Sequence, residues 1–184
     1  QHLRTTAPTQ FGGAVADGGC AEDDGPPIGT SGPWATRLAH FRFDRAPSAA
    51  GDEIQSEYFV PRRHAADALR AVRGLAHRID PLLIISEFRT IAGDDLWLSG
   101  GEGGPRLGIH FTWQKRPDEV AALLPRIEDA LAPFAVRAHW GKLYSDRLGQ
   151  RAAYRRVPDF VGLMSRVDPS GKFRAPHLDR TLGI

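Results

Sequence analysis

The chain has 184 residues, of which 41% are hydrophobic and 25% charged, as in a globular protein with one good core. Its formal net charge is only +2, and no run of Lys and Arg with interleaved aromatic residues occurs, so a nucleic-acid partner is not expected. No apolar run approaches the roughly 18 residues of a membrane span, which argues against a transmembrane segment.

The only cysteine, Cys20, excludes an internal disulfide and fits a reducing compartment. We therefore expect a cytoplasmic protein, for which peripheral attachment to a membrane stays an alternative. Cys20 has no nearby His or second Cys, so no metal site is predicted. Residues 1–31 are rich in Gly, Ala, Pro and Asp and show no period, which predicts a disordered or linker segment. The alternation over residues 40–43 then predicts a short edge strand.

From Glu53 onward the hydrophobic pattern becomes regular. It predicts, in order, a strand at 53–61, a helix at 62–79, strands at 82–91 and 106–114, a helix at 117–132 and a strand at 134–139. Pro125 should kink the second helix or split off its first turn. The Gly-rich tip at 100–104 is followed by a strand and not by a helix, which favours a hairpin loop over a nucleotide-binding loop.

This order is that of an α+β, ferredoxin-like split-βαβ fold, an antiparallel sheet with both helices on one face. The first and third strands should be neighbours, and the third should also pair with the second. The helix-covered face should hold the apolar positions of the strands, which are Ile54, Tyr58, Val60, Ile84, Phe88, Ile109, Phe111 and Trp113.

The opposite face of the sheet is expected to gather polar side chains from three adjacent strands. These are Gln55 and Glu57, then Glu87 and Arg89, then His110 and Thr112. Acid, base and hydroxyl groups at similar height, beside a glycine at 108, indicate the wall of a polar pocket. A solvated face with an ordinary surface ion pair is the alternative.

Residues 141–184 form a tail that adds little to this core. Phe160, Leu163, Met164 and Val167 predict a last helix, for which Asp159 is the expected cap. Residues 168–171 predict a type I turn after it. We expect this C-terminal helical tail to pack on another domain.

Six blocks in order carry a resemblance to a known family: GPW..RL.HFR (32–42), QSEY..PR.HA (55–65), E.RT (87–90), HFTW (110–113), HWGK (139–142) and DP.GKF (168–173). Over this region the chain resembles the C-terminal half of bacterial alditol oxidases, which are similar to aldonolactone oxidases and belong to the vanillyl-alcohol-oxidase superfamily of FAD enzymes. The resemblance implies a substrate cap at 32–140 and a segment at 141–184 that completes an FAD domain.

The same resemblance implies roles for individual residues. Glu87 and Arg89 match the pair around the reacting hydroxyl, and Thr112 and Lys142 match further substrate contacts. Lys142 also matches a position near the flavin pyrimidine edge, where His139 precedes it in the HWGK block. His110, Gln55 and Glu57 are additional substrate-binding candidates, and His110 is equally compatible with a structural hydrogen bond.

The expected function is oxidation of a polyol's primary alcohol by hydride transfer to FAD, with oxygen as the acceptor and hydrogen peroxide as the product. The family's flavin attachment segment has no counterpart here, so the flavin-binding domain is expected upstream or on a partner chain. The isolated chain should accordingly be colourless and inactive. The alternatives are part of an aldonolactone (D-arabinono-1,4-lactone type) oxidase or dehydrogenase, or a stand-alone ferredoxin-like ligand-binding module.

Overall fold

A computed structural model of the chain describes residues 2–4, 31–33 and 53–184. The chain divides into two compact units, Gln1–Gly51 and Asp52–Ile184. In the first unit, strand β1 (His2–Arg4) pairs antiparallel with strand β2 (Ser31–Pro33). Cys20 and the strand predicted at 40–43 lie outside the described residues.

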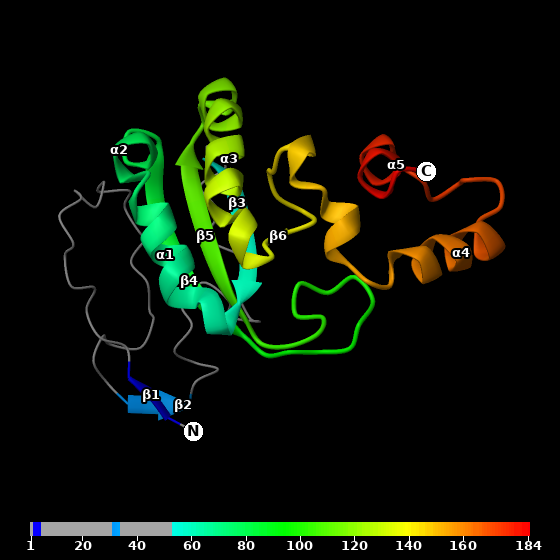
Figure 1. The fold of residues 1–184 in the computed structure, drawn as a ribbon, viewed down its shortest axis with the longest axis horizontal. Coiled ribbons are helices and arrows are strands. Elements are labelled where there is room, and N and C mark those ends of the chain that lie inside the picture. Colours follow the sequence, from blue (N-terminus) through cyan, green and yellow to red (C-terminus); the bar gives the residue numbers. More distant parts are fainter. Residues whose placement is uncertain (1, 5–30, 34–52) are drawn as a thin grey trace. The chain divides into compact units, whose positions relative to one another are not determined.

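The second unit is built on a four-stranded sheet of β3 (Glu53–Pro61), β4 (Leu83–Ile91), β5 (Arg106–Gln114) and β6 (Arg137–Ala138). The strand order is β4-β5-β3-β6, and every neighbouring pair is antiparallel (Figure 1). The first and third strands of the motif, β3 and β5, are thus neighbours, and β5 also pairs with β4. This confirms the predicted α+β class and its strand pairing.

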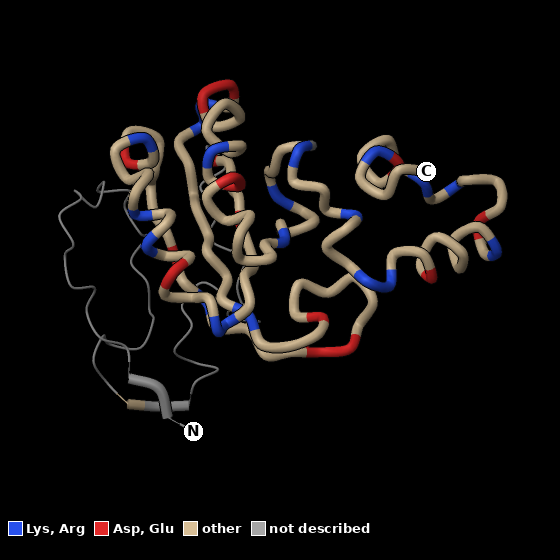
Figure 2. Tube along the Cα trace, in the orientation of Figure 1, with Lys and Arg blue, Asp and Glu red and all other residues tan. Residues whose placement is uncertain are grey.

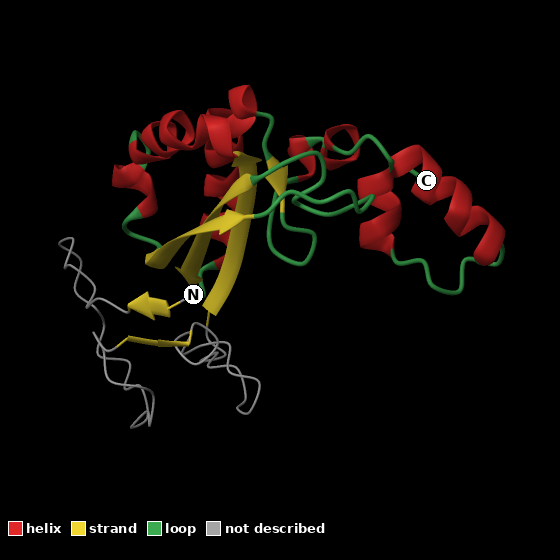
Figure 3. Cartoon of the chain, turned by 90° about the horizontal axis from the view of Figure 1, so that it is seen from below, coloured by secondary structure: helices red, strands yellow, loops and turns green. Residues whose placement is uncertain are grey.

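Helices α1 (Ala65–Arg73), α2 (Ala76–Ile79) and α3 (Pro117–Leu131) lie on one side of this sheet (Figure 3). The single helix predicted at 62–79 is wrong in detail. It begins as a 3-10 turn, η3 (Arg62–His64), and is interrupted between α1 and α2 at Gly74 and Leu75. A glycine inside a helix costs about 1 kcal/mol relative to alanine, which is sufficient for a break where the chain turns toward β4.

Pro125 does not split off the first turn of its helix, because α3 continues unbroken through it, and the kink that was the other expectation stays a prediction. Proline removes one backbone donor, which leaves the carbonyl of Ala121 without its helical partner. Ala121 is on the exposed side of the helix, so water can take the place of that donor. The stripe of buried residues on both sides of Pro125 keeps the helix packed on the sheet.

The fourth strand is shorter than the predicted span of 134–139. Residues Ala132–Phe134 instead form a 3-10 turn, η4, and Ala135 adopts a left-handed conformation with φ of 50°. The chain therefore reaches strand geometry only at Arg137, and β6 pairs with β3 through Tyr58 and Phe59.

The core lies between the sheet and the helices, and Tyr58, Ile109 and Trp113 are fully buried in it. Two residues assigned to that face are not in the core, since Ile84 and Phe88 are 52% and 58% exposed. Both belong to β4, the edge strand of the sheet. Ile84 lies at a register shift between Leu83 and Ile85, so Leu83 takes its place opposite Trp113 and packs against the core. Phe88 follows the predicted alternation, opposite Ile109, and its exposure means that the helices do not cover this part of the edge strand.

Ser56→Ala should destabilise the second unit by about 2 kcal/mol, because it leaves a buried donor without an acceptor. The indole Nε1 of Trp113 donates to Ser56 Oγ at 2.9 Å, and both side chains are fully buried. Urea denaturation of the variant measures the loss. Ser86→Ala, on the edge strand, is the matched control and should change the free energy of unfolding by less than about 0.5 kcal/mol.

The C-terminal segment contains two 3-10 turns, η5 (Asp146–Leu148) and η6 (Gln150–Ala153), and helices α4 (Val157–Val167) and α5 (Pro176–Leu182). It has a small core of its own, made of Tyr154, Val157 and Leu182 with Trp140 packed against them. The predicted last helix is confirmed as α4, whereas α5 was not predicted. No helix in the described ranges is long and apolar enough for a membrane span.

Of the two predictions about the ends of α4, the one for its cap is wrong and the one for the turn after it is confirmed. Asp159 is not the helix cap, because α4 begins two residues earlier and Asp159 lies in its first turn, paired with Arg156 at 3.1 Å. The turn predicted at 168–171 is confirmed by a 3.1 Å hydrogen bond from Gly171 N to Asp168 O. The carboxylate of Asp168 also accepts hydrogen bonds from the backbone amides of the two residues after this turn.

Candidate active site

The sheet face away from the helices brings charged side chains together by strand register. His110 of β5 is directly opposite Glu57 of β3 on one side and Glu87 of β4 on the other. One step along the sheet, Arg89 is opposite Gly108. Because side chains two residues apart share a face, these groups point the same way, as the alternation predicted.

The carboxylate of Glu57 is at the centre of this group and is only 4% exposed. Lys142 Nζ donates to its Oε2 at 2.7 Å, and Arg89 Nη1 donates to its two oxygens at 3.1 and 3.2 Å. Nδ1 of His110 lies 3.4 Å from the same Oε2. One buried negative charge thus holds two cations from different parts of the chain.

Lys142 reaches this position because the chain continues alongside β3 after β6 ends. The amide of His139 donates to Glu57 O at 2.9 Å, and the amide of Leu143 donates to Gln55 O at 2.9 Å. These backbone bonds fix the residues between them against β3. They place the ammonium of Lys142 over the carboxylate of Glu57.

Three side chains form an outer layer over Glu57 and His110. Glu87, Arg89 and Lys142 are 38%, 33% and 16% exposed, and Arg89 Nη2 lies 2.5 Å from Glu87 Oε2. Gly108 makes room for this layer, because a Cβ there would lie 3.2 Å from Glu57 Oε1 and 3.6 Å from the Arg89 Cβ. A ligand approaching this face would meet Glu87, Arg89 and Lys142 first.

The electrostatics of the cluster favour an ionised Glu57. Burial by itself raises the pKa of this carboxyl, but the hydrogen bond from Lys142 and the charges of Lys142 and Arg89 outweigh it and lower the pKa to about 2. Burial, together with the charge of Lys142, lowers the pKa of His139 against the opposing effect of Glu57. His139 is therefore neutral at physiological pH.

The contacts of His110 define its tautomer. Lys142 Nζ is 2.8 Å from His110 Nδ1, and an ammonium has donors but no acceptor, so Nδ1 must be the acceptor. The ring proton is then on Nε2, which donates to Thr112 Oγ1 at 3.1 Å. The hydroxyl proton of Thr112 stays available to another acceptor.

The structure thus brings together six of the predicted residues, which are Glu57, Glu87, Arg89, His110, Thr112 and Lys142. Gln55 is opposite Thr112 in the strand register, but its side chain donates from Nε2 to Glu53 Oε1 at 3.0 Å and not to a member of this cluster. The ring of His139 packs near Phe59, with centroids 5.9 Å apart, and its Nδ1 accepts from Gly141 N at 3.0 Å. In the ranges 2–4, 31–33 and 53–184, no group of three or more His, Cys, Asp or Glu could hold a metal ion.

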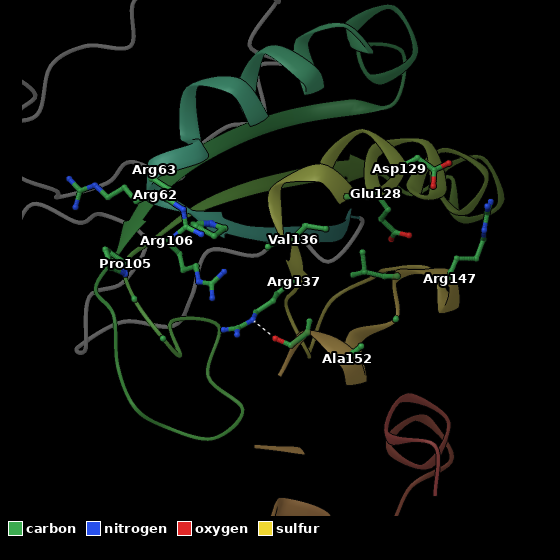
Figure 4. A pocket seen from close by; sticks show the side chains of 18 residues that line it. Arg62, Arg63, Pro105, Arg106, Glu128, Asp129, Val136, Arg137, Arg147 and Ala152 are labelled. Carbon is green, nitrogen blue, oxygen red and sulfur yellow. Dashed lines mark hydrogen bonds between the residues drawn. The ribbon is translucent and has the colours of Figure 1, made fainter. Parts of the chain in front are cut away.

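A second feature, which the sequence patterns did not reveal, is a cavity of about 650 Å³ lined by five arginines: Arg62, Arg63, Arg106, Arg137 and Arg147 (Figure 4). Arg62 and Arg63 directly follow β3, and Arg106 is the first residue of β5. These arginines lie at the same edge of the sheet because Pro61, the last residue of β3, pairs with Arg106. The antiparallel pairing of these two strands was predicted from the sequence, and it could have indicated that the three arginines lie close together. Figure 2 shows further basic residues along the segment 147–156.

Comparison with known proteins places this chain in a family. The family model of D-arabinono-1,4-lactone oxidase matches residues 50–181. The chain is 44% identical over 154 residues to an alditol oxidase of Streptomyces sp. (strain IKD472 / FERM P-14339), a match that covers 83% of this chain and 37% of the relative. It is 29% identical over 133 residues to L-gulono-1,4-lactone dehydrogenase of Mycobacterium tuberculosis, covering 70% of this chain and 30% of that protein.

The chain thus spans only about a third of the length of these curated relatives, 37% of one and 30% of the other. The match to the family model includes all four strands of the sheet and every residue of the charged cluster. On this evidence the chain belongs to the D-arabinono-1,4-lactone oxidase family.

Proposed function

We propose that this chain is the substrate-binding part of an FAD-dependent, cytoplasmic oxidase that converts the primary alcohol of a polyol into an aldehyde. Oxygen is the proposed electron acceptor, and the product from it is hydrogen peroxide. The observation that carries the proposal is the outer layer of Glu87, Arg89 and Lys142, in which two cations are fixed beside an accessible carboxylate. Residues 32–140 would form the substrate cap, and 141–184 would complete a flavin-binding domain on the same polypeptide or on a partner chain.

Oxidation of an alcohol removes the hydroxyl proton and a hydride from the carbon that bears the oxygen. FAD, when bound, supplies the acceptor for that hydride. Arg89 has donors left after its bonds to Glu57 and Glu87, and we assign them to the substrate oxygen, on which negative charge develops. Glu87 uses Oε2 for Arg89, so Oε1 is the oxygen that would orient the hydroxyl or accept its proton.

Lys142 is the residue of this chain that best fits a flavin. Two of its three ammonium donors are used by Glu57 and His110, and the side chain stays partly exposed. The remaining donor suits the pyrimidine edge of the flavin ring, where it would stabilise negative charge. His139, which is neutral, comes three residues before Lys142 in the chain. It is proposed to lie along the same pyrimidine edge of the flavin ring.

Among the buried members of the cluster, Glu57 and His110 are proposed to act on the substrate through other residues, and Thr112 is proposed to contact it. Glu57 holds Arg89 and Lys142, so a positioning role suits it better than direct contact with substrate. Thr112 offers its hydroxyl proton to a polyol oxygen, and His110 fixes that hydroxyl. Gln55, which lies beside Thr112 in register, is the outermost substrate candidate.

Substrate comparison in the flavin-loaded holoenzyme tests the proposal. We expect kcat/KM for a polyol such as xylitol to exceed that for an aldonolactone by at least about 10-fold, with hydrogen peroxide formed in proportion. The lactone is a real competitor, because the family model and one relative are named for lactones. A preference for lactone would reassign the substrate, and polyol binding by the chain without any flavin partner, together with an inactive holoenzyme, would favour a stand-alone binding module.

A further inference from the structure

We propose that the arginine-lined cavity binds an oxyanion of the phosphate type. The cavity is walled by η3, by the loop that enters β5, and by the segments on either side of β6 (Figure 4). It is separate from the Glu87–Arg89–Lys142 layer, and this inference does not depend on the proposed oxidation.

Arg106 is the central observation. Its side chain lines the cavity, yet the residue is only 7% exposed. A guanidinium carries five N–H donors, and among the described residues Arg106 makes one side-chain hydrogen bond, from Nη2 to Glu102 O at 3.0 Å. Its buried Nε has no acceptor. A buried cation with so few partners is unfavourable unless an anion neutralises it.

The carboxylate nearest to this charge is already in use. Glu102 Oε2 binds Arg137 Nη2 at 2.7 Å, and its Oε1 binds Arg155 at 3.4 Å. Arg137 is further fixed by donation to the carbonyls of Glu102 and Ala153 at 2.8 and 2.9 Å. One carboxylate therefore faces three arginines, and Arg106 receives no charge of its own.

Glu128, at the other end of the cavity, does not supply the missing charge. Glu128 accepts hydrogen bonds from Tyr58 at 3.0 Å and from the amide of Ser145 at 2.8 Å, and burial raises its pKa despite these donors. Near Arg106 the remaining neighbours are basic. Burial and the like charges of Arg137 and Arg63 lower the pKa of Arg106, against the effects of Tyr154 and Glu102.

These features select the class of ligand. A guanidinium presents its donors in a planar fork that matches two oxygens of a phosphate, whereas a chloride ion offers a single acceptor atom and a single charge to several arginines. Arg62 and Arg63 lie at the same end of the cavity as Arg106 and add charge that a dianion would use (Figure 4). At about 650 Å³ the cavity also has room for the remainder of a small phosphorylated molecule.

The test uses the 184-residue chain and inorganic phosphate at constant ionic strength, near neutral pH. We expect saturable changes in the NMR signal of the Arg106 Nε–H group and a rise in melting temperature with phosphate concentration. Sulfate should compete and chloride should not. Arg63→Gln should weaken binding by about 10-fold, and Arg106→Gln should weaken it by about 10- to 100-fold. Arg73→Gln, an exposed arginine of α1, is the control and should bind as the unaltered chain does.

Arg106 is buried, so its variant is checked for folding first, and Arg63→Gln decides the outcome if that variant does not fold. A response that grows without saturation, or that is equal in the Arg63→Gln and Arg73→Gln variants, would mean non-specific anion binding and would overturn the proposal. Acetate is included as a carboxylate probe. If acetate bound as tightly as phosphate, a carboxylate would be the ligand and the phosphate assignment would fail.

Discussion

Replacing Arg89 with alanine in the flavin-loaded holoenzyme is expected to lower kcat roughly 100-fold, while KM changes much less. The charge on the substrate oxygen grows in the transition state, so a cation beside it contributes more there than in the ground state. In the structure Arg89 is held by Glu57 and Glu87, at 3.1 and 2.5 Å. Steady-state kinetics on a polyol, with the melting temperature of each variant, measures the effect.

Arg89→Lys should recover only part of the loss, because an ammonium does not reproduce the two-pronged guanidinium contact with Glu57 and Glu87. Arg126→Ala, an exposed arginine of α3, is the control and should leave kcat unchanged. The competing interpretation is an ion pair on a solvated face, which would contribute at most about 1 kcal/mol of stability and nothing to turnover. Unchanged kcat with a small fall in melting temperature would support that interpretation and remove Arg89 from the mechanism.

The fold was largely predictable because hydrophobic period and strand alternation report burial directly. The alternation in β3, β4 and β5 correctly assigned Glu57, Glu87, Arg89 and His110 to one face. It failed for the exposure of Phe88, because alternation gives the face of a sheet but not how far the helices extend over it.

The sequence patterns also could not predict how deeply each side chain of the site is buried. Glu57 and Glu87 are equivalent in an alternating pattern, yet one is buried and the other is 38% exposed. The difference arises because Lys142, 85 residues away from Glu57 in the chain, closes over it through the backbone pairing that follows β6. A contact of that range depends on tertiary packing, so local spacing assigned both carboxylates to the same layer.

The shift of the Glu57 pKa leads to a prediction about stability. Its folded-state pKa of about 2 is below the ordinary value of 4.5, so the native state favours the ionised form. A lowered pKa contributes stability that is fully present above the unfolded-state value and is lost as the pH falls toward the folded-state value. A shift of this size is worth about 3 kcal/mol, and that contribution should disappear between about pH 5 and pH 2.

Glu57→Gln should accordingly destabilise the chain by about 3 kcal/mol at neutral pH, because the amide keeps the shape but leaves Arg89 and Lys142 without their buried counter-charge. Urea denaturation across this pH range should show the difference between the two proteins shrinking as the pH falls, since protonated Glu57 resembles glutamine. Glu119→Gln, at a 53% exposed ion pair with Arg116, is the control and should cost at most about 1 kcal/mol. A difference between Glu57→Gln and the unaltered chain that stayed constant with pH would mean that Glu57 acts through packing and not through its charge.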